Sequence, residues 1–365
     1  MAIKQAEEYR DPDIAAMLIR KIQQTSQKPV RLMEVCGTHT MAIFRHGVRQ
    51  VIPDHISLLS GPGCPVCVTT QQEIDTFIAL TGLEKTIVAT FGDLMRVPGT
   101  ESSLQNERAC GKDIRMVYST FDALDLARKN PDKKIIFLGV GFETTAPTIA
   151  ASIICAFQEG INNYFVYSSH KRVTPALFAL MEDEDVNIDG LILPGHVSVI
   201  IGTDAYRPLF DKYRLPCAVA GFEPADILKG ISSLIDQIES RHPRLDNTYP
   251  RAVTAGGNKK AQAMIQKVFE NTDTEWRGLG TIPQSGLKIR EVFEAFDAQK
   301  VFAVKIPKFN EPKGCACGNV LKGTLTPPDC PLYSKLCTPT SPVGPCMVSS
   351  EGTCSAYYRY HSNSL

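Results

Sequence analysis

The sequence has no excess of charge of either sign. Lys and Arg together number 39, as do Asp and Glu, so the formal net charge is zero. Binding to nucleic acid or to an anionic membrane surface relies on a basic excess, at least locally. Composition therefore predicts neither nucleic acid nor a membrane as a partner.

Long hydrophobic runs are also missing. The most apolar stretch, residues 145–157, is broken by Pro147 and is followed by Gln158 and Glu159, so it is too short to span a bilayer. The opening residues, MAIKQAEEYRDPD, have no apolar segment after a basic start, which a secretory signal would have. We therefore expect a cytoplasmic protein. Its 365 residues suggest two or three domains.

The chain is unusually rich in cysteine. Disulfides rarely persist in the cytoplasm, so twelve cysteines there indicate metal ligands or redox groups rather than covalent staples. Three cysteines lie in motifs near the N-terminus, and three others are scattered. The remaining six crowd into the C-terminal tail, and these are Cys315, Cys317, Cys330, Cys337, Cys346 and Cys354.

Short apolar runs alternate with helical patterns up to about residue 310, which predicts an α/β fold with Rossmann-like parallel sheets. The alternation runs twice, so we expect one α/β domain at 28–130 and a second at 131–285. Residues 1–27 and 286–365 then form an N-terminal helix and a loop-rich C-terminal domain. The expected strands are Leu32–Cys36, Ile56–Leu59, Thr86–Thr90, Ile114–Tyr118, Lys134–Val140, Tyr164–Tyr167, Gly190–Leu193, Cys217–Ala220 and Ala252–Ala255.

Two prolines mark helix starts. Asp11 and Pro12 have the residue types of an N-cap and a first helical position, and Thr174 and Pro175 repeat the pattern. We expect helices to begin at both places.

The first motif whose residues could bind a ligand or react is MEVCGTHT. It places Cys36 at the end of a strand and His39 in the loop that follows. A thiolate is a soft ligand and a strong nucleophile, and a nearby histidine or helix N-terminus lowers the pKa of a thiol. The alternative is a buried structural cysteine. The small and polar neighbours favour an open functional site at Cys36 and His39.

The second motif is GPGCPVC, in which Cys64 and Cys67 form a Cys-x-x-Cys pair before a helix expected near Thr69. Such pairs are typical of thiol-disulfide chemistry. Half of a zinc site is the alternative, but it would need two more ligands. We favour redox chemistry or transient metal ligation, and we expect these two thiols to be able to form a disulfide.

The third motif is the tail. Its thiols occur in a segment without hydrophobic periodicity, which needs something other than a core to order it. Four cysteine ligands suit a [4Fe-4S] cluster, and the long uneven spacing differs from the close pairs of zinc sites. We assign the cluster to Cys330, Cys337, Cys346 and Cys354, leaving the role of Cys315 and Cys317 open.

Two further strand ends carry candidate polar groups. Glu143 lies in the segment GVGFETTAP, and His196 lies in LPGHVS. Ligand sites in α/β folds gather at the carboxyl ends of strands, so both side chains could face a cleft opposite Cys36. The alternatives are an ordinary strand-to-helix turn for Glu143 and a structural role for His196.

Taken together, the segments MEVCGTHT, GPGCPVC, TFGDLMRVPG, GVGFETTAPT, LPGHVSVIIG and CTPTSPVGPCMVSSEGTCSAYYRY resemble the HypD family of nickel-iron hydrogenase maturation factors. These segments extend from residue 33 to residue 360, and none of them departs from the family pattern.

The resemblance implies two α/β domains and a third domain with an iron-sulfur cluster. It also implies an assembly scaffold with redox chemistry rather than a conventional turnover enzyme. In that family the protein pairs with a small chaperone, HypC, receives cyanide from HypE, and holds an iron that carries two cyanides and one carbonyl. Cys36, with Cys64 and Cys67, would then be the metal-binding thiols, and the cluster and the Cys-x-x-Cys pair would relay electrons.

Two other functions remain open at this point. An iron-sulfur-dependent thiol-disulfide reductase would use the tail cluster and Cys64 and Cys67, with Cys36 incidental. A structural zinc-binding interaction protein would use the tail cysteines for zinc alone.

Overall fold

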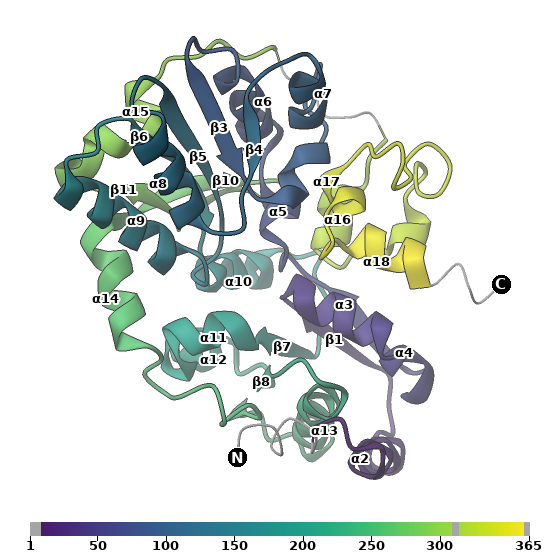
Figure 1. The fold of residues 1–365 in the computed structure, drawn as a ribbon. Helices are drawn as coiled ribbons and strands as arrows, with labels where there is room; N and C mark the ends of the chain where they lie inside the picture. Colours follow the sequence, from purple (N-terminus) through teal and green to yellow (C-terminus); the bar gives the residue numbers. More distant parts are fainter. Residues whose placement is uncertain (1–8, 309–313, 361–365) are drawn as a thin grey trace.

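The computed structural model describes residues 9–308 and 314–360. Within these residues the strands form two sheets, and the cysteine-rich tail lies beside them as a third, mostly irregular unit (Figure 1). The structure confirms the predicted α/β class. Residues 1–8, which carry part of the prediction that no signal sequence is present, lie outside the described residues.

The five-stranded sheet has the order β2-β1-β7-β8-β9, and its paired strands are parallel. A parallel sheet buried on both faces needs apolar residues at successive positions, and β1 shows this with Leu32 and Met33 on opposite faces, both fully buried. The strands of this sheet are β1 (Val30–Glu34), β2 (Ile56–Ser60), β7 (Gly190–Pro194), β8 (Cys217–Ala220) and β9 (Leu245–Asn247).

The six-stranded sheet has the order β10-β11-β6-β5-β3-β4. Its central strands are parallel, while β10 and β11 form an antiparallel hairpin that pairs with β6. Its strands are β3 (Thr86–Thr90), β4 (Ile114–Met116), β5 (Lys134–Gly141), β6 (Tyr164–Lys171), β10 (Phe269–Trp276) and β11 (Gly280–Ile289).

The sheets do not follow the division expected at residue 130. β1 and β2 pair with the later β7, β8 and β9, whereas β3 and β4 pair with β5 and β6. Each sheet is therefore built from two separate stretches of chain. Alternation of strands and helices reveals that parallel sheets are present, but it does not say which strands become neighbours.

Most expected strands occur within a few residues of their predicted bounds, with one error and three omissions. Residues 252–255 form a turn, in which the amides of Ala252 and Val253 both donate to the carbonyl of Tyr249. The strand there is β9, just upstream. The hairpin of β10 and β11 escaped prediction because β10 alternates polar and half-buried residues instead of forming an apolar run.

The helices begin largely where capping chemistry places them. Helix α2 (Pro12–Thr25) starts at Pro12, with the Asp11 carboxylate accepting from the Asp13 amide, as predicted. Helix α10 (Val173–Glu182) starts two residues before the predicted Pro175, because the Glu143 carboxylate accepts a hydrogen bond from its first amide. Helix α6 (Gln71–Leu80) begins two residues after the expected start near Thr69, with Thr70 as its N-cap.

The remaining helices and 3-10 turns cover the sheets and order the tail. Those of the body are α3 (Gly37–Arg45), α4 (Val48–Val51), α5 (Pro65–Val68), η1 (Gly92–Arg96), α7 (Leu104–Ala109), α8 (Thr120–Lys129), α9 (Ala146–Glu159), α11 (Gly195–Ile201), η2 (Thr203–Tyr206), α12 (Arg207–Tyr213), α13 (Pro224–Ser240), α14 (Lys259–Val268), η3 (Glu291–Phe296) and α15 (Ala298–Val301). Those of the tail are α16 (Cys317–Leu321), η4 (Pro327–Asp329), α17 (Pro345–Val348) and α18 (Thr353–Tyr360).

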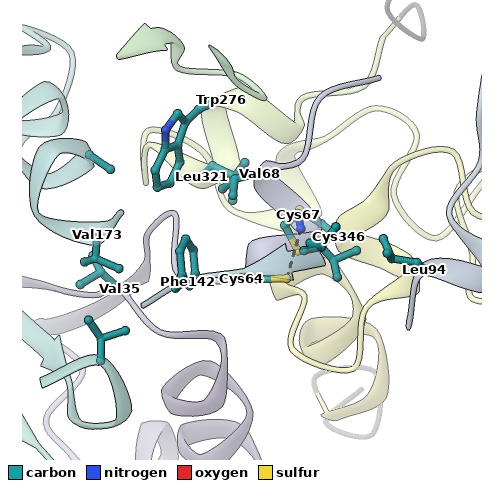
Figure 2. Packing of buried hydrophobic residues seen from close by; sticks show 14 of the residues in the cluster. Val35, Cys64, Cys67, Val68, Leu94, Phe142, Val173, Trp276, Leu321 and Cys346 are labelled. Atoms are coloured by element: carbon teal, nitrogen blue, oxygen red, sulfur yellow. Dashed lines mark hydrogen bonds between the residues drawn. The ribbon is translucent and has the colours of Figure 1, made fainter. Parts of the chain in front are cut away.

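One hydrophobic core joins all three parts of the molecule. It contains Met33 and Leu191 of the five-stranded sheet, Val88 and Ile136 of the six-stranded sheet, and Cys346 of the tail. Figure 2 shows part of it, with the tail residue Cys346 against Cys67 of α5. The tail is thus anchored to the body by burial at the point where the thiol motifs meet.

Candidate functional site

Cys36 lies between β1 and α3, at the carboxyl end of a central strand. The GPGC loop that follows β2 packs directly on it, since the amide of Gly37 donates to the carbonyl of Gly63 at 2.9 Å. A Cβ atom at Gly63 would lie 2.1 Å from the backbone nitrogen of Cys36, so only glycine fits there. Parallel pairing of β1 with β2 therefore brings the first two thiol motifs together.

The Cys36 thiol is buried, with 8% of the residue exposed. Burial raises its pKa to about 12, with Glu351 and Glu34 adding to the shift, while the backbone amides of His39 and Thr38 act in the opposite direction. The expectation of a low thiol pKa at Cys36 is wrong, because loss of hydration outweighs the helix N-terminus.

Glu34 is a buried carboxyl group beside Cys36 that the sequence motifs did not single out. It accepts hydrogen bonds from the Cys36 amide at 3.0 Å and from the Thr40 hydroxyl. Burial raises its pKa to about 7, against the effect of these donors. Glu34 is the last residue of β1, and a buried glutamate is costly without partners. Its place in the otherwise apolar run LMEVC was the signal available in the sequence.

His39 is fully buried and faces the five-stranded domain. Its Nε2 lies 2.9 Å from the carbonyl oxygen of Gly221, and its ring stacks on Phe222 with centroids 4.6 Å apart. Burial lowers its pKa to about 4, so the ring is neutral at physiological pH. Its Nδ1 is buried and has no hydrogen-bond partner among the described residues.

His196 packs on the other face of the same phenylalanine. The rings of His196 and Phe222 stack with centroids 3.9 Å apart, so Phe222 lies between two histidines. We expected His196 to reach Cys36 from a second domain, but β1 and β7 are adjacent strands of one sheet. His196 therefore belongs to the same sheet edge as Cys36.

Glu143 does come from the other sheet, at the end of β5. It is buried, and its carboxylate oxygens lie 3.1 Å and 3.3 Å from the amide of Val173. Burial raises its pKa to about 7. Glu143 and Cys36 both act on the pKa of the buried Tyr206 phenol. Glu143 also accepts from the first amide of α10.

The Cys64 and Cys67 pair is held by the short helix α5. The Cys67 amide donates to the Cys64 sulfur at 3.2 Å, the dashed contact in Figure 2. Burial raises the pKa of Cys67 well above its usual range, and its side chain interacts with Cys346 of the tail. The Cys64 thiol instead donates to the hydroxyl of Ser349 at 3.3 Å.

The tail thiols converge on one small cavity of about 20 Å³. Cys317 and Cys346 are in contact, with their sulfur atoms 3.1 Å apart. Burial raises the pKa of Cys354, and four neighbouring thiols add to that shift. The cysteines around the cavity are Cys315, Cys317, Cys330, Cys337, Cys346 and Cys354.

The thiols are therefore arranged as a continuous series from the Cys-x-x-Cys motif into the tail. The Cys67 amide donates to the Cys64 sulfur, the Cys67 side chain interacts with that of Cys346, and the sulfur atoms of Cys346 and Cys317 are in contact. All twelve cysteines lie in the described part of the chain, and none is joined in a disulfide. The motifs predicted each group, while their contact depends on packing between the tail and α5.

A model described as "HypD: Hydrogenase formation hypA family" matches residues 13–361. The chain belongs to the HypD family. The sequence resemblance is thereby confirmed, and membership supports a role in hydrogenase maturation.

Individual relatives in this family are similar along their full length. The hydrogenase maturation factor HypD of Rhodobacter capsulatus is 44% identical, covering 98% of each chain. The HypD protein of Escherichia coli (strain K12) is 42% identical, covering 97% of each chain. A putative hydrogenase expression/formation protein of Methanocaldococcus jannaschii is 43% identical, over 94% of this chain and 96% of its own.

The donor set of this HypD-family tail fits an iron-sulfur cluster by its chemistry, because six thiols line one cavity and thiolates are the usual cluster ligands. Among residues 9–308 and 314–360, no three His, Cys, Asp or Glu side chains converge closely enough to hold a single metal ion. In the same residues, no helix combines the length and the apolar composition that crossing a membrane requires.

Proposed function

We propose that this HypD-family chain is the scaffold on which the Fe(CN)2CO group of nickel-iron hydrogenase is assembled, with the iron bound at Cys36. The observation that carries the proposal is the junction of Cys36, the Cys-x-x-Cys loop and the tail. Gly63 packs on Cys36, and Cys67 contacts Cys346. The proposed iron site, the Cys64 and Cys67 dithiol and the thiol-rich tail therefore meet within one chain.

Cys36 would bind the iron as a thiolate. A soft thiolate donor suits low-spin iron that carries cyanide and carbonyl. The raised pKa of the Cys36 thiol means that iron binding must displace its proton. Glu34, whose carboxylate already accepts from the Cys36 amide, is a suitable group to receive it.

The tail would hold a resident [4Fe-4S] cluster, which supplies single electrons when bound. Our sequence assignment uses Cys330, Cys337, Cys346 and Cys354. The contacts of Cys346 with Cys317 and Cys67 favour a revised set, in which Cys315 replaces Cys346.

In this revised set Cys317 and Cys346 remain free to act as a dithiol between the cluster and the Cys64 and Cys67 pair. Thiol-disulfide exchange along adjacent sulfur atoms then needs no large movement.

A small HypC-like chaperone would approach Cys36 from the hollow beside α3, and a HypE-like protein would deliver cyanide. The hollow measures about 640 Å³ and is lined in part by Thr38, Met41 and Phe222. Thr38 is two residues from Cys36, so a partner thiolate seated here would come close to the iron.

Infrared spectroscopy of the anaerobically purified chain, with and without a HypC-like partner, tests this proposal. Bands in the cyanide and carbonyl stretching region are expected when the partner is present. Protein that contains iron and acid-labile sulfide, yet shows no such bands under any condition, would contradict the scaffold function.

A thiol-disulfide reductase is the second candidate, favoured by the series of contacts from Cys64 to Cys317. In that function Cys36 is incidental, so Cys36→Ala would leave disulfide reduction intact. Metal analysis separates both functions from a zinc-binding interaction protein, because stoichiometric zinc without sulfide would exclude a cluster.

A further inference from the structure

A single carboxylate joins the body of the protein to the tail beside Cys64. Asp93 belongs to η1, which follows β3 in the TFGDLMRVPG segment. Its Oδ2 atom accepts from the Ser350 hydroxyl at 2.9 Å, from the Ser350 amide at 3.1 Å and from the Ser349 hydroxyl at 3.1 Å. Three donors on one carboxylate oxygen make this an unusually well-bound contact, because hydrogen bonds to charged groups are the stronger ones.

The Ser349 hydroxyl is also in contact with the redox pair. Its oxygen accepts the Cys64 thiol at 3.3 Å and the Glu351 amide at 3.2 Å. A serine hydroxyl has one hydrogen to donate and two lone pairs. Because the hydrogen goes to Asp93, both lone pairs are directed toward Cys64 and Glu351. The orientation of the Ser349 hydroxyl therefore depends on Asp93.

The same turn carries Cys346. The amide of Ser349 donates to the carbonyl of Pro345 at 3.0 Å, which closes the turn of α17 around Cys346. A Cβ atom at Gly352 would lie 2.1 Å from the carbonyl oxygen of Cys346, so the backbone folds tightly back on itself. Fixing Ser349 and Ser350 thus also fixes the cysteine that contacts Cys67.

We propose that Asp93 is a positioning residue for thiol exchange. By holding Ser349 and Ser350 it orients the Cys64 thiol and keeps Cys346 against Cys67. This inference rests on the proposed exchange of electrons between the Cys64 and Cys67 pair and the tail thiols, and it adds the residue that sets their geometry. Asp93 itself touches no thiol.

The exchange concerned is balanced among four sulfur atoms. A Cys64–Cys67 dithiol gives two electrons and two protons to a Cys317–Cys346 disulfide, whose S–S bond breaks while the Cys64–Cys67 bond forms. The reverse direction reduces the Cys64–Cys67 disulfide. The equilibrium between the protein with a Cys317–Cys346 disulfide and the protein with a Cys64–Cys67 disulfide depends on how well each disulfide fits the geometry that residues 345–350 impose.

The test compares four full-length variants: Asp93→Ala, Asp93→Asn, Ser350→Ala and Asp122→Ala. Asp122 is the matched control, because one of its carboxylate oxygens also accepts several hydrogen bonds, here from two backbone amides at the start of α8 and away from the thiols. Each variant is equilibrated in glutathione buffers of stepped potential. Alkylation and mass spectrometry then give the oxidised fraction of Cys64 and Cys67 and the labelling rate of Cys64.

Asp93→Ala is expected to shift the exchange equilibrium and to raise the Cys64 labelling rate, each by about tenfold, the scale of a lost hydrogen bond to a charged group. Asp93→Asn keeps an acceptor oxygen and should shift both by less. Ser350→Ala, which leaves the Asp93–Ser349 contact, and Asp122→Ala should stay within about twofold of the original chain.

Equal behaviour of Asp93→Ala and Asp122→Ala in both readouts would overturn the proposal, leaving Asp93 a structural cap. If Asp93→Ala does not fold, Ser349→Ala supplies the same comparison, because it removes the acceptor of the Cys64 thiol. Failure of the scaffold function is separate: it is seen as absent cyanide and carbonyl bands, while the Cys64 and Cys67 equilibrium is still measured. A chain in which Cys64 and Cys67 never oxidise would overturn this inference and leave the Cys36 site untouched.

Discussion

Cys36 and Cys67 are both buried thiols at the junction of the three units, yet their surroundings differ. Cys36 is surrounded by oxygen and nitrogen groups, with Glu34, Glu351 and the amides at the start of α3 acting on it. Cys67 is surrounded by sulfur, with Cys64, Cys346 and Cys317 acting on it. Hydrogen-bonding groups can hold a polar ligand complex, whereas adjacent sulfur atoms can exchange electrons. The proposed ligand site and the proposed redox path therefore have different chemical surroundings within one chain.

The largest expected effect comes from removing the ligand thiol alone. Cys36→Ala should abolish the cyanide and carbonyl infrared bands while leaving tail iron and sulfide unchanged, because the tail thiols line a separate cavity. Cys110→Ala is the matched control, since Cys110 is an exposed thiol away from the junction. Bands that persist in Cys36→Ala protein purified with its partner would move the iron to the Cys64 and Cys67 pair.

The second comparison separates Cys315 from Cys346 within the tail. Cys315→Ala should lose most of the acid-labile sulfide and iron, because a [4Fe-4S] cluster takes four thiolates. Cys346→Ala should retain them and instead block exchange with Cys67. Iron and sulfide are measured per chain on anaerobic preparations. The opposite result would restore the ligand set Cys330, Cys337, Cys346 and Cys354.

The surroundings of Cys36 and Cys67 also show which features the sequence could predict and which it could not. Each thiol motif was visible, and so were the buried parallel strands, because apolar runs of β-branched residues are a local signal. Pairing is not local. Cys36 meets the GPGC loop only because β1 pairs with β2, and His196 joins the same edge because β7 lies on the other side of β1.

Residues that act through contacts were missed for the same reason. Asp93 and Ser349 are 256 positions apart in the sequence, and neither belongs to a ligand motif. Glu34 lies within the MEVCGTHT motif, yet its role depends on burial, which composition does not reveal at one position. The tail was predicted as a cluster domain by its thiol density, but not as a partner of α5.

A third, smaller effect concerns pH. Burial raises the pKa of Glu143 from 4.5 to about 7, so the folded protein holds this proton more tightly than the unfolded chain. Its contribution to stability is greatest below pH 4.5 and is lost as the pH rises through 7. A shift of this size corresponds to about 3 kcal/mol.

Glu143→Gln removes that dependence while keeping an acceptor for the Val173 amide. The difference in unfolding free energy between the two proteins should change by about 2 to 3 kcal/mol between pH 5 and pH 8, in favour of glutamine at high pH. Urea unfolding at both pH values measures it, and Glu101→Gln, at an exposed site, is the control. A difference that does not vary with pH would mean that Glu143 is ionised and stabilised in the folded protein.

The smallest effect tests the contact that links the two regions. The Thr38 hydroxyl donates to the Glu351 carboxylate at 2.5 Å, so the Cys36 loop is tied to the turn that follows Ser349. Thr38→Val keeps the shape and removes the donor, which should cost about 1 to 3 kcal/mol of unfolding free energy. Thr148→Val is the control, because Thr148 donates only to a carbonyl of its own helix end.

Infrared bands should persist in Thr38→Val protein, since Cys36 and its neighbouring amides are unchanged. The Cys64 and Cys67 equilibrium should also stay near that of the original chain, because Asp93 still holds Ser349 and Ser350. If Thr38→Val instead shifts that equilibrium as strongly as Asp93→Ala does, the turn is held from the Cys36 side as well. A change at the proposed ligand site would then alter the geometry of the proposed redox path through residues 349–351. The two sites would still differ in the chemical groups that surround each thiol.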